Sequence, residues 1–220
     1  MQIMKGIVLM NGVGYNSNIY LIDGELLVDA GTGSMFSEVK EEISNNGFTP
    51  DQIQAVVNTH CHYDHTGGDK KFRDWTGAKI AIHKKDARAL ESGEGTLAEM
   101  FDETAKTITV DKRLKGGNRI VTSNFDFEVI ETPGHTPGSI CLYEKEKKLL
   151  ISGDTLFTSG MGRTDLPGGN EKNLFDSLYK LSKLDIDYLL PGHDMPKTSG
   201  VNFILKRFLH RKKKIDKQVV

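Results

Sequence analysis

The feature that most constrains this chain is a six-residue run, His60-Cys61-His62-Tyr63-Asp64-His65, which holds three histidines and a carboxylate. It follows the apolar Ala55-Val56-Val57, which predicts a buried strand. On a helix, side chains two positions apart point about 200° away from each other, so His60 and His62 could not share an ion with Asp64 and His65. At a strand end that turns into a loop, they can. The spacing therefore predicts a metal site presented from a loop.

Three later segments end an apolar, strand-like run with another residue that can bind a metal, namely His135, Asp154 and His193. Glycine precedes each of them, and proline also flanks the two histidines. Such neighbours suit a stiff turn that holds an imidazole or a carboxylate in a fixed direction. Because four separate segments share this arrangement, we expect their side chains to converge on one site.

The hydrophobic pattern predicts the architecture. Short β-rich runs alternate with segments of helical spacing. Two β-rich halves with flanking helices predict an α+β fold, an αββα sandwich of two mixed β-sheets flanked by helices. Ser34 or Ser37 is expected to cap the first helix. Strands are expected at residues 18–22, 25–29, 55–58, 79–83, 125–131, 139–143, 148–152 and 188–190, and helices at 34–46, 67–75, 84–90, 174–184 and 201–213.

The length predicts a single domain over residues 1–220, because a chain of this size can bury one complete two-layer core. The pattern weakens within residues 91–118, where two pairs of glycines bracket a few apolar side chains. This segment could be a lid over the site, a contact surface of a homo-oligomer, or an ordinary long connection.

Composition excludes several classes of partner. The net charge of −1 gives no reason to expect a nucleic acid. The chain shows neither a signal-peptide core nor an apolar run long enough to span a bilayer, so we expect a cytoplasmic protein with no membrane partner. Cys61 alternates with the histidines on either side and is expected to be a buried apolar residue. His83 is expected to serve packing or capping, and His210 to be solvated.

The pattern Thr-His-x-His-x-Asp-His, followed by a histidine, an aspartate and a further histidine, resembles the metallo-β-lactamase superfamily over nearly the whole chain. The resemblance implies that Asp29 supports the ligand loop. Since all the implied donors are nitrogen or oxygen, two divalent metals are expected, zinc first, with iron or manganese as alternatives. The implied ligands are His60, His62 and His135 for the first metal, Asp64, His65 and His193 for the second, and Asp154 as a bridge between them.

Within this family, the stretch from Gly153 to Gly169 looks like the glyoxalase II-type hydrolases, the hydroxyacylglutathione hydrolases. The resemblance implies hydrolysis of a small-molecule thioester, such as a glutathione conjugate, by a hydroxide that bridges the two metals. Asp64 is the candidate catalytic residue, because it would orient that nucleophile. Arg163 occupies the position of a family cation that contacts the glutathione part, and a guanidinium suits a carboxylate. An ion pair between Arg163 and Asp165 is the alternative role for this side chain.

Other activities remain open at this stage. Persulfide dioxygenases of the same superfamily resemble the chain in His-Cys-His-x-Asp-His and in Gly-Arg-Thr-Asp, and they imply a single Fe(II) held by His60, His135 and Asp154. A lactone or another ester is a further alternative substrate for a hydrolase. A purely structural zinc site is disfavoured, because such a site is closed by four ligands and this chain offers seven.

Overall fold

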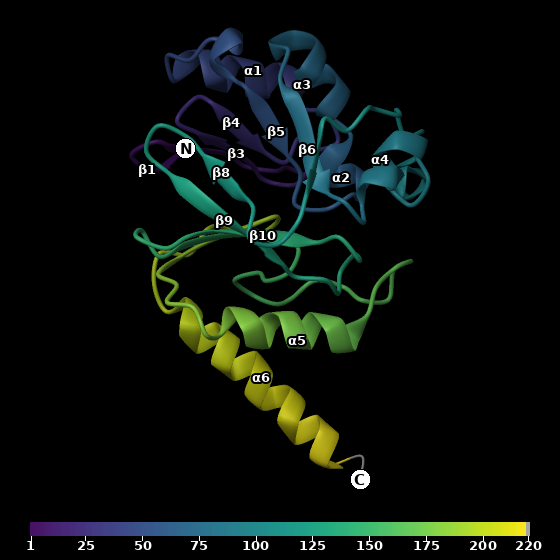
Figure 1. Ribbon diagram of the computed structural model, residues 1–220, viewed down its shortest axis with the longest axis vertical. Coiled ribbons are helices and arrows are strands. Elements are labelled where there is room, and N and C mark those ends of the chain that lie inside the picture. The colour runs from purple at the N-terminus through teal and green to yellow at the C-terminus, as the bar shows by residue number, and fades with distance from the viewer. Residues whose placement is uncertain (219–220) are drawn as a thin grey trace.

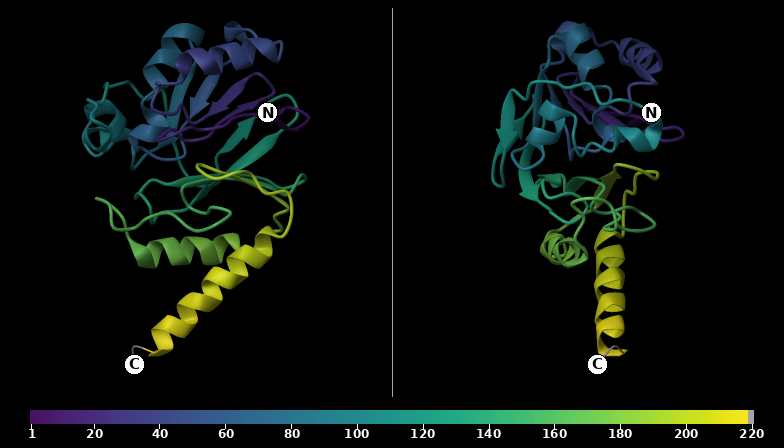
Figure 2. Two further views of the ribbon diagram at one scale, coloured as in Figure 1. Left: turned by 180° about the vertical axis from the view of Figure 1, so that it is seen from behind. Right: turned by 90° about the vertical axis from the view of Figure 1, so that its right-hand side faces the viewer.

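The computed structural model describes the backbone of residues 1–218 and the side chains of residues 1–210. Two β-sheets stack face to face, and helices cover both outer faces (Figure 1). This arrangement confirms the predicted αββα sandwich, and Figure 2 shows the same four layers from two further sides. No helix among the described residues is both long enough and apolar enough to cross a bilayer.

The first sheet contains seven strands in chain order, and its first half is antiparallel whereas its second half is parallel. Parallel neighbours need a crossover connection, which is why helices alternate with the later strands. The strands are β1 (Gln2–Met4), β2 (Ile7–Met10), β3 (Ile19–Ile22), β4 (Leu26–Val28), β5 (Ala55–Val57), β6 (Lys79–His83) and β7 (Lys112–Leu114). The connecting helical segments are α1 (Phe36–Asn45), η1 (Pro50–Gln52), α2 (Tyr63–Thr66), α3 (Asp69–Thr76), α4 (Ala87–Ser92) and η2 (Ala98–Phe101).

The second sheet is also mixed, because its last strand lies parallel to its neighbour while the other pairs are antiparallel. Its strand order is β12-β11-β10-β9-β8. The bounds are β8 (Arg119–Val121), β9 (Asp126–Glu131), β10 (Ile140–Glu144), β11 (Leu149–Gly153) and β12 (Tyr188–Pro191), and the helices α5 (Glu171–Leu181) and α6 (Val201–Gln218) cover its outer face.

Three apolar layers follow from the two-residue period of the strands. In β2, Ile7 and Leu9 face the second sheet, whereas Val8 and Met10 pack under the outer helices. Strand β10 divides in the same way, with Ile140 facing the first sheet. Both faces of these strands are apolar because helices cover the outer faces, so the strands appear in the sequence as continuous hydrophobic runs.

Several predicted details were wrong. Neither Ser34 nor Ser37 caps α1, which begins after Met35 without a side-chain cap, because the Ser34 hydroxyl instead bonds with Thr32 and Asn16. The helix expected from residue 84 begins at Ala87. Strands β1, β2, β7 and β8 were not predicted. Residues 91–118, whose role the sequence left open, contain η2 and β7.

Candidate metal centre

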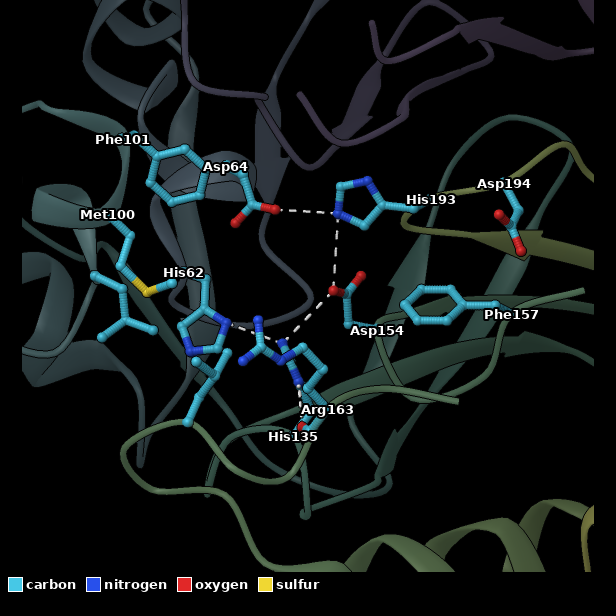
Figure 3. A pocket seen from close by; sticks show the side chains of 12 residues that line it. His62, Asp64, Met100, Phe101, His135, Asp154, Phe157, Arg163, His193 and Asp194 are labelled. Atoms are coloured by element: carbon cyan, nitrogen blue, oxygen red, sulfur yellow. Dashed lines mark hydrogen bonds and ion pairs between the residues drawn. The ribbon is translucent and has the colours of Figure 1, made fainter. Parts of the chain in front are cut away.

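The predicted ligands lie together at one edge of the two sheets, in loops that follow the carboxyl ends of strands. Figure 3 shows those that line the cavity, namely His62, Asp64, His135, Asp154 and His193. His60 and His62 follow β5, and His62 is the residue before α2. Asp64 and His65 lie on α2 itself, so the predicted loop includes one helical turn. The three remaining ligands come from the second sheet, where His135 follows β9, Asp154 follows β11 and His193 follows β12.

Among the described residues, three groups bring potential ligand atoms within 4.8 Å of one another. Two of the groups share His60 and two share His65, so all seven residues belong to one continuous cluster. His60, His135 and Asp154, the set implied for a single iron, occur in these groups but not together in one of them. The groups are His60, His62 and His135; His60, His65 and Asp154; and Asp64, His65 and His193.

Asp154 occupies the middle of this cluster. Its Oδ1 lies 3.2 Å from Nε2 of His65, and its Oδ2 lies 3.5 Å from Nε2 of His135 and 3.8 Å from Nε2 of His193. The two carboxylate oxygens therefore face ligands from both implied metal positions. On the far side, Oδ2 of Asp64 lies 3.0 Å from Nε2 of His193.

An observation that is independent of the family resemblance also indicates that these donors bind divalent metals. Nε2 of His60 is buried and has no hydrogen-bond partner among the described residues, whereas His62 faces Nε2 of His135 with its Nδ1, at 2.9 Å. Burying a polar nitrogen without a partner costs free energy, and binding a cation removes that cost. Imidazole and carboxylate donors are the ligands that zinc, iron and manganese accept.

The protonation states also suit cation binding. Burial, followed by the neighbouring imidazoles, lowers the pKa of His60 well below its ordinary value. Burial likewise lowers the pKa of His62 to about 3, so both rings are neutral at neutral pH, as metal ligation requires. Burial alone would raise the pKa of Asp154, but His65 and the other imidazoles outweigh it and hold the pKa below its usual range.

His65 shows where positive charge is favoured. Burial alone would lower its pKa, but the carboxylates of Asp154, Asp29 and Asp64 outweigh burial and raise the pKa well above its ordinary value. The three carboxylates therefore favour a positive charge at this place. A divalent cation at this place would compensate the same negative charge, as expected for a site built to hold one.

Asp29 supports the ligand loop from the end of β4. Its Oδ1 accepts a hydrogen bond of 2.8 Å from the backbone N–H of Thr59, and its Oδ2 lies 2.9 Å from Nδ1 of His65. The second contact directs Nε2 of His65 toward the cluster. Asp29 has a φ of +61°, a conformation that aspartate tolerates better than most residues.

Replacing Asp29 by asparagine should weaken metal binding about 10-fold to 100-fold, because one amide oxygen cannot accept from both Thr59 and His65. The measurement is a competition titration with a chromophoric chelator. Asp23→Asn is the matched control, since Asp23 also has a positive φ but bonds with Thr122 and Asn124. Unchanged metal affinity in Asp29→Asn would show that the carboxylate has no part in holding the loop.

Residues that sequence reasoning missed hold the ligand loops together across the two sheets. Asn18 donates from Nδ2 to the carbonyl oxygens of Pro191, at 3.0 Å, and Asp194, at 2.8 Å, and so fixes the turn on both sides of His193. Tyr20 donates to the same Pro191 oxygen at 2.7 Å. The available signal was a polar residue at the start of an apolar strand, but its partners lie more than 170 positions away.

Asp86 is a second missed residue, and it joins the two loops of the first implied metal position. Its buried carboxylate accepts hydrogen bonds from the backbone N–H of Cys61 at 3.1 Å and from the hydroxyl of Thr136 at 2.6 Å. Cys61 lies between two ligands and Thr136 follows His135, so Asp86 sets the separation of these ligands. Burial raises its pKa, which shows that this position is costly for a charge.

The residues expected to lie outside the site do so. Cys61 is buried in the core under the outer helices, and burial raises the pKa of its thiol. His83 is buried, and its Nε2 lies 2.9 Å from a carboxylate oxygen of Glu131. His210 is exposed.

A cavity of about 350 Å³ opens over the cluster. Arg163 lies at its edge, with its guanidinium paired to the carboxylate of Asp165 at 3.0 and 2.8 Å, which is the alternative role that the sequence left open. The lining residues are His62, Asp64, Leu97, Met100, Phe101, His135, Asp154, Phe157, Arg163, Leu166, His193 and Asp194. Residues 91–118 therefore contribute directly to the cavity.

Known proteins resemble this chain in sequence. The chain is 37% identical over 202 residues to the probable metallo-hydrolase MJ0888 of Methanocaldococcus jannaschii, covering 85% of this chain and 92% of that protein. It is 36% identical over 143 residues to the hydroxyacylglutathione hydrolase of Rhodospirillum rubrum, covering 64% of this chain but only 48% of that protein.

Solved structures share the fold. The BLEG-1 B3 metallo-beta-lactamase superposes with a TM-score of 0.77 at 29% identity, covering 92% of this chain and 99% of that one. TTHA1623 in a di-iron-bound form gives a TM-score of 0.75 at 27% identity, covering 87% and 94%. A model of the metallo-beta-lactamase superfamily matches residues 12–193, from the loop after β2 to the last predicted ligand. The chain belongs to the metallo-beta-lactamase superfamily.

Proposed function

We propose that the protein is a metal-dependent hydrolase with a two-metal centre, and that it hydrolyses thioesters by a reaction of the glyoxalase II type. The observation that carries the proposal is the position of Asp154, whose carboxylate faces His135 of the first ligand group and His65 and His193 of the second. A carboxylate placed between two ligand groups is the arrangement that a two-metal site needs. The proposed metal is zinc, with iron or manganese as alternatives.

When bound, the two metals would polarise a carbonyl group and lower the pKa of a water molecule toward neutrality. The chain's own residues then have separate tasks. His60, His62 and His135 would hold one ion, and Asp64, His65 and His193 the other. Asp64 also lines the cavity, where its carboxylate can accept a hydrogen bond from the attacking water and orient it.

The leaving group favours a thioester over an amide. Water adds to the carbonyl carbon, the C–S bond breaks, and the sulfur leaves as a thiolate that takes a proton from solvent. A thiol has a pKa of about 8.5, so the thiolate leaves without a strong general acid. Among the described residues that line the cavity, the imidazoles and most carboxylates belong to the ligand cluster. Thioester hydrolysis therefore suits this site, because it does not need a general acid beyond the ligand cluster.

The relatives support the proposal at two levels. The probable metallo-hydrolase of Methanocaldococcus jannaschii supports hydrolysis over most of the chain. The hydroxyacylglutathione hydrolase of Rhodospirillum rubrum supports the thioester branch over the aligned 143 residues. The di-iron form of TTHA1623 supports iron as a metal to test beside zinc.

The test is elemental analysis of the purified protein, followed by a thioester panel that begins with S-lactoylglutathione. We expect about two metals per chain and thiol release that a chelator abolishes and added metal restores. One iron per chain, with oxygen consumed in proportion to glutathione persulfide, would replace the hydrolase by a dioxygenase. If the protein binds two metals and hydrolyses lactones but no thioester, the proposed two-metal centre stands and the proposed substrate class is wrong.

Arg163 is the proposed contact for a substrate carboxylate, and this contact requires its guanidinium to exchange Asp165 for the substrate. Arg163→Ala should raise KM for a thioester with a carboxylated thiol about 10-fold and should leave kcat within about twofold, because the interaction is equal in ground and transition states. A thioester with a neutral thiol should change little. Equal effects on the two thioesters, measured by steady-state kinetics, would argue against anion recognition.

A further inference from the structure

One side of the cavity is built from apolar side chains of the segment around η2. We call Leu97, Met100 and Phe101 the apolar wall; all three line the cavity. Figure 3 shows Met100 and Phe101 on the side of the cavity that carries His62 and Asp64, with Phe157 on the opposite side. Arg163 is the one cation among the described residues that line the cavity, and its guanidinium is paired with Asp165.

The apolar wall is attached to the ligand run and is not a loose loop. The backbone N–H of Tyr63, the residue between His62 and Asp64, donates to the carbonyl oxygen of Thr96 at 2.7 Å. The ring of Tyr63 lies 5.8 Å from the ring of Phe101. Tyr15 contacts the same ring edge-on, also with 5.8 Å between centroids. These contacts fix Phe101 beside the metal ligands.

Part of the apolar wall and of its neighbour Tyr15 is exposed to solvent. Met100 keeps 56% of its surface exposed, and Tyr15, which packs against Phe101, keeps 77%. Leu97 and Asp102, at the two ends of η2, both adopt a left-handed backbone conformation. Such a conformation is unfavourable for a residue such as leucine and lowers the stability of the fold. The side chain of Leu97 nevertheless lines the cavity. A ligand group that covers them would gain free energy in proportion to the apolar area it buries.

We propose that the apolar wall binds the acyl group of the substrate, and that this group is a hydrocarbon chain or an aryl ring rather than a small hydroxyacyl group. The inference rests on the proposed thioester hydrolysis, since the carbonyl must lie at the ligand cluster. From there, an acyl chain on the side of His62 and Asp64 meets Met100 and Phe101. A hydroxyl group on that chain would lose its water without gaining a partner from the wall.

The test compares acyl groups on one carrier, 3-mercaptopropionate, whose single carboxylate is available to Arg163 in every case. Steady-state kcat/KM is measured for the acetyl, lactoyl, hexanoyl and phenylacetyl thioesters, each divided by its rate of hydrolysis in hydroxide. We expect the hexanoyl and phenylacetyl values to exceed the acetyl and lactoyl values about 10-fold or more. Equal values, or a preference for lactoyl, would overturn the inference while leaving thioester hydrolysis intact.

Substitutions in the apolar wall test whether these side chains cause the preference among acyl groups. Phe101→Ala should lower the ratio of the hexanoyl value to the acetyl value about 10-fold. Met100→Ala, at a position that is 56% exposed, should lower this ratio as well. Phe203→Ala on α6 is the matched control, since Phe203 is 71% exposed and does not line the cavity. An unchanged acyl preference in both wall variants would overturn the inference, and no hydrolysis of any thioester by the two-metal protein would overturn the proposed function itself.

Discussion

Asp154→Ala should reduce thioester hydrolysis by at least about a thousandfold and lower the metal content from two ions per chain to one or none. The carboxylate lies between His65, His135 and His193, so its removal takes a ligand from both implied metal positions. The loss of metal-assisted stabilisation amounts to several kcal/mol, and each 1.36 kcal/mol corresponds to about a factor of ten in rate. Metal content is measured by elemental analysis and activity by release of thiol.

Asp176→Ala is the matched control for this variant, because Asp176 is an exposed carboxylate on α5 that pairs with Lys172. It should keep both metals and full activity. Far-ultraviolet circular dichroism establishes that Asp154→Ala is folded. A folded Asp154→Ala protein that keeps two metals would refute the bridging role, whatever its activity.

Gly192→Ala should abolish the binding of the second metal and reduce activity about 100-fold or more, although it adds a single methyl group. A Cβ at this position would lie 2.3 Å from Oδ1 of Asp154 and 2.7 Å from Cε1 of His65. Either the two ligands or the turn that presents His193 must therefore move. Misplacing reacting groups by about 1 Å can cost on the order of 100-fold in rate.

The stability of Gly192→Ala should fall by only about 1–3 kcal/mol, the usual cost of overpacking, so the fold should survive. Thermal unfolding measures this change and separates it from the loss of metal. Gly160→Ala is the matched control, since a Cβ there meets nothing within 4 Å and its backbone needs no left-handed conformation. If Gly192→Ala binds two metals as tightly as the original chain, the methyl group does not displace Asp154, His65 or the turn that presents His193.

Local hydrophobic pattern predicted most of the fold. Strands β3 to β6 and β9 to β12 were predicted because they are apolar runs between turn residues. Strands β7 and β8 were missed, because they are three residues long and largely exposed, so their sequences show no buried run. They form because neighbouring strands offer hydrogen bonds, which is a property of the sheet and not of the segment.

In the candidate site, too, some residues could be predicted from the sequence and others could not. The seven residues that cluster as candidate ligands could be named in advance, because a metal selects imidazole and carboxylate groups and strand ends present them in a recognisable spacing. Asn18, Tyr20 and Asp86 could not be named, since their importance lies in bonds to loops far away in the chain. The pair of Arg163 and Asp165 could be foreseen as an alternative, because the two residues are two positions apart.

Local sequence patterns therefore specified which donor atoms are available and which architecture carries them, because each strand and the donor residue at its end lie close together in the chain. The tertiary structure decided how far apart the two ligand groups lie, which atoms stay without partners, and which apolar side chains border the cavity. The physical reason is that burial of apolar surface brings the two sheets together without regard to direction, whereas specific bonds such as that from Asn18 to the Pro191 carbonyl fix their relative position. Such bonds form only between segments that folding has already brought side by side.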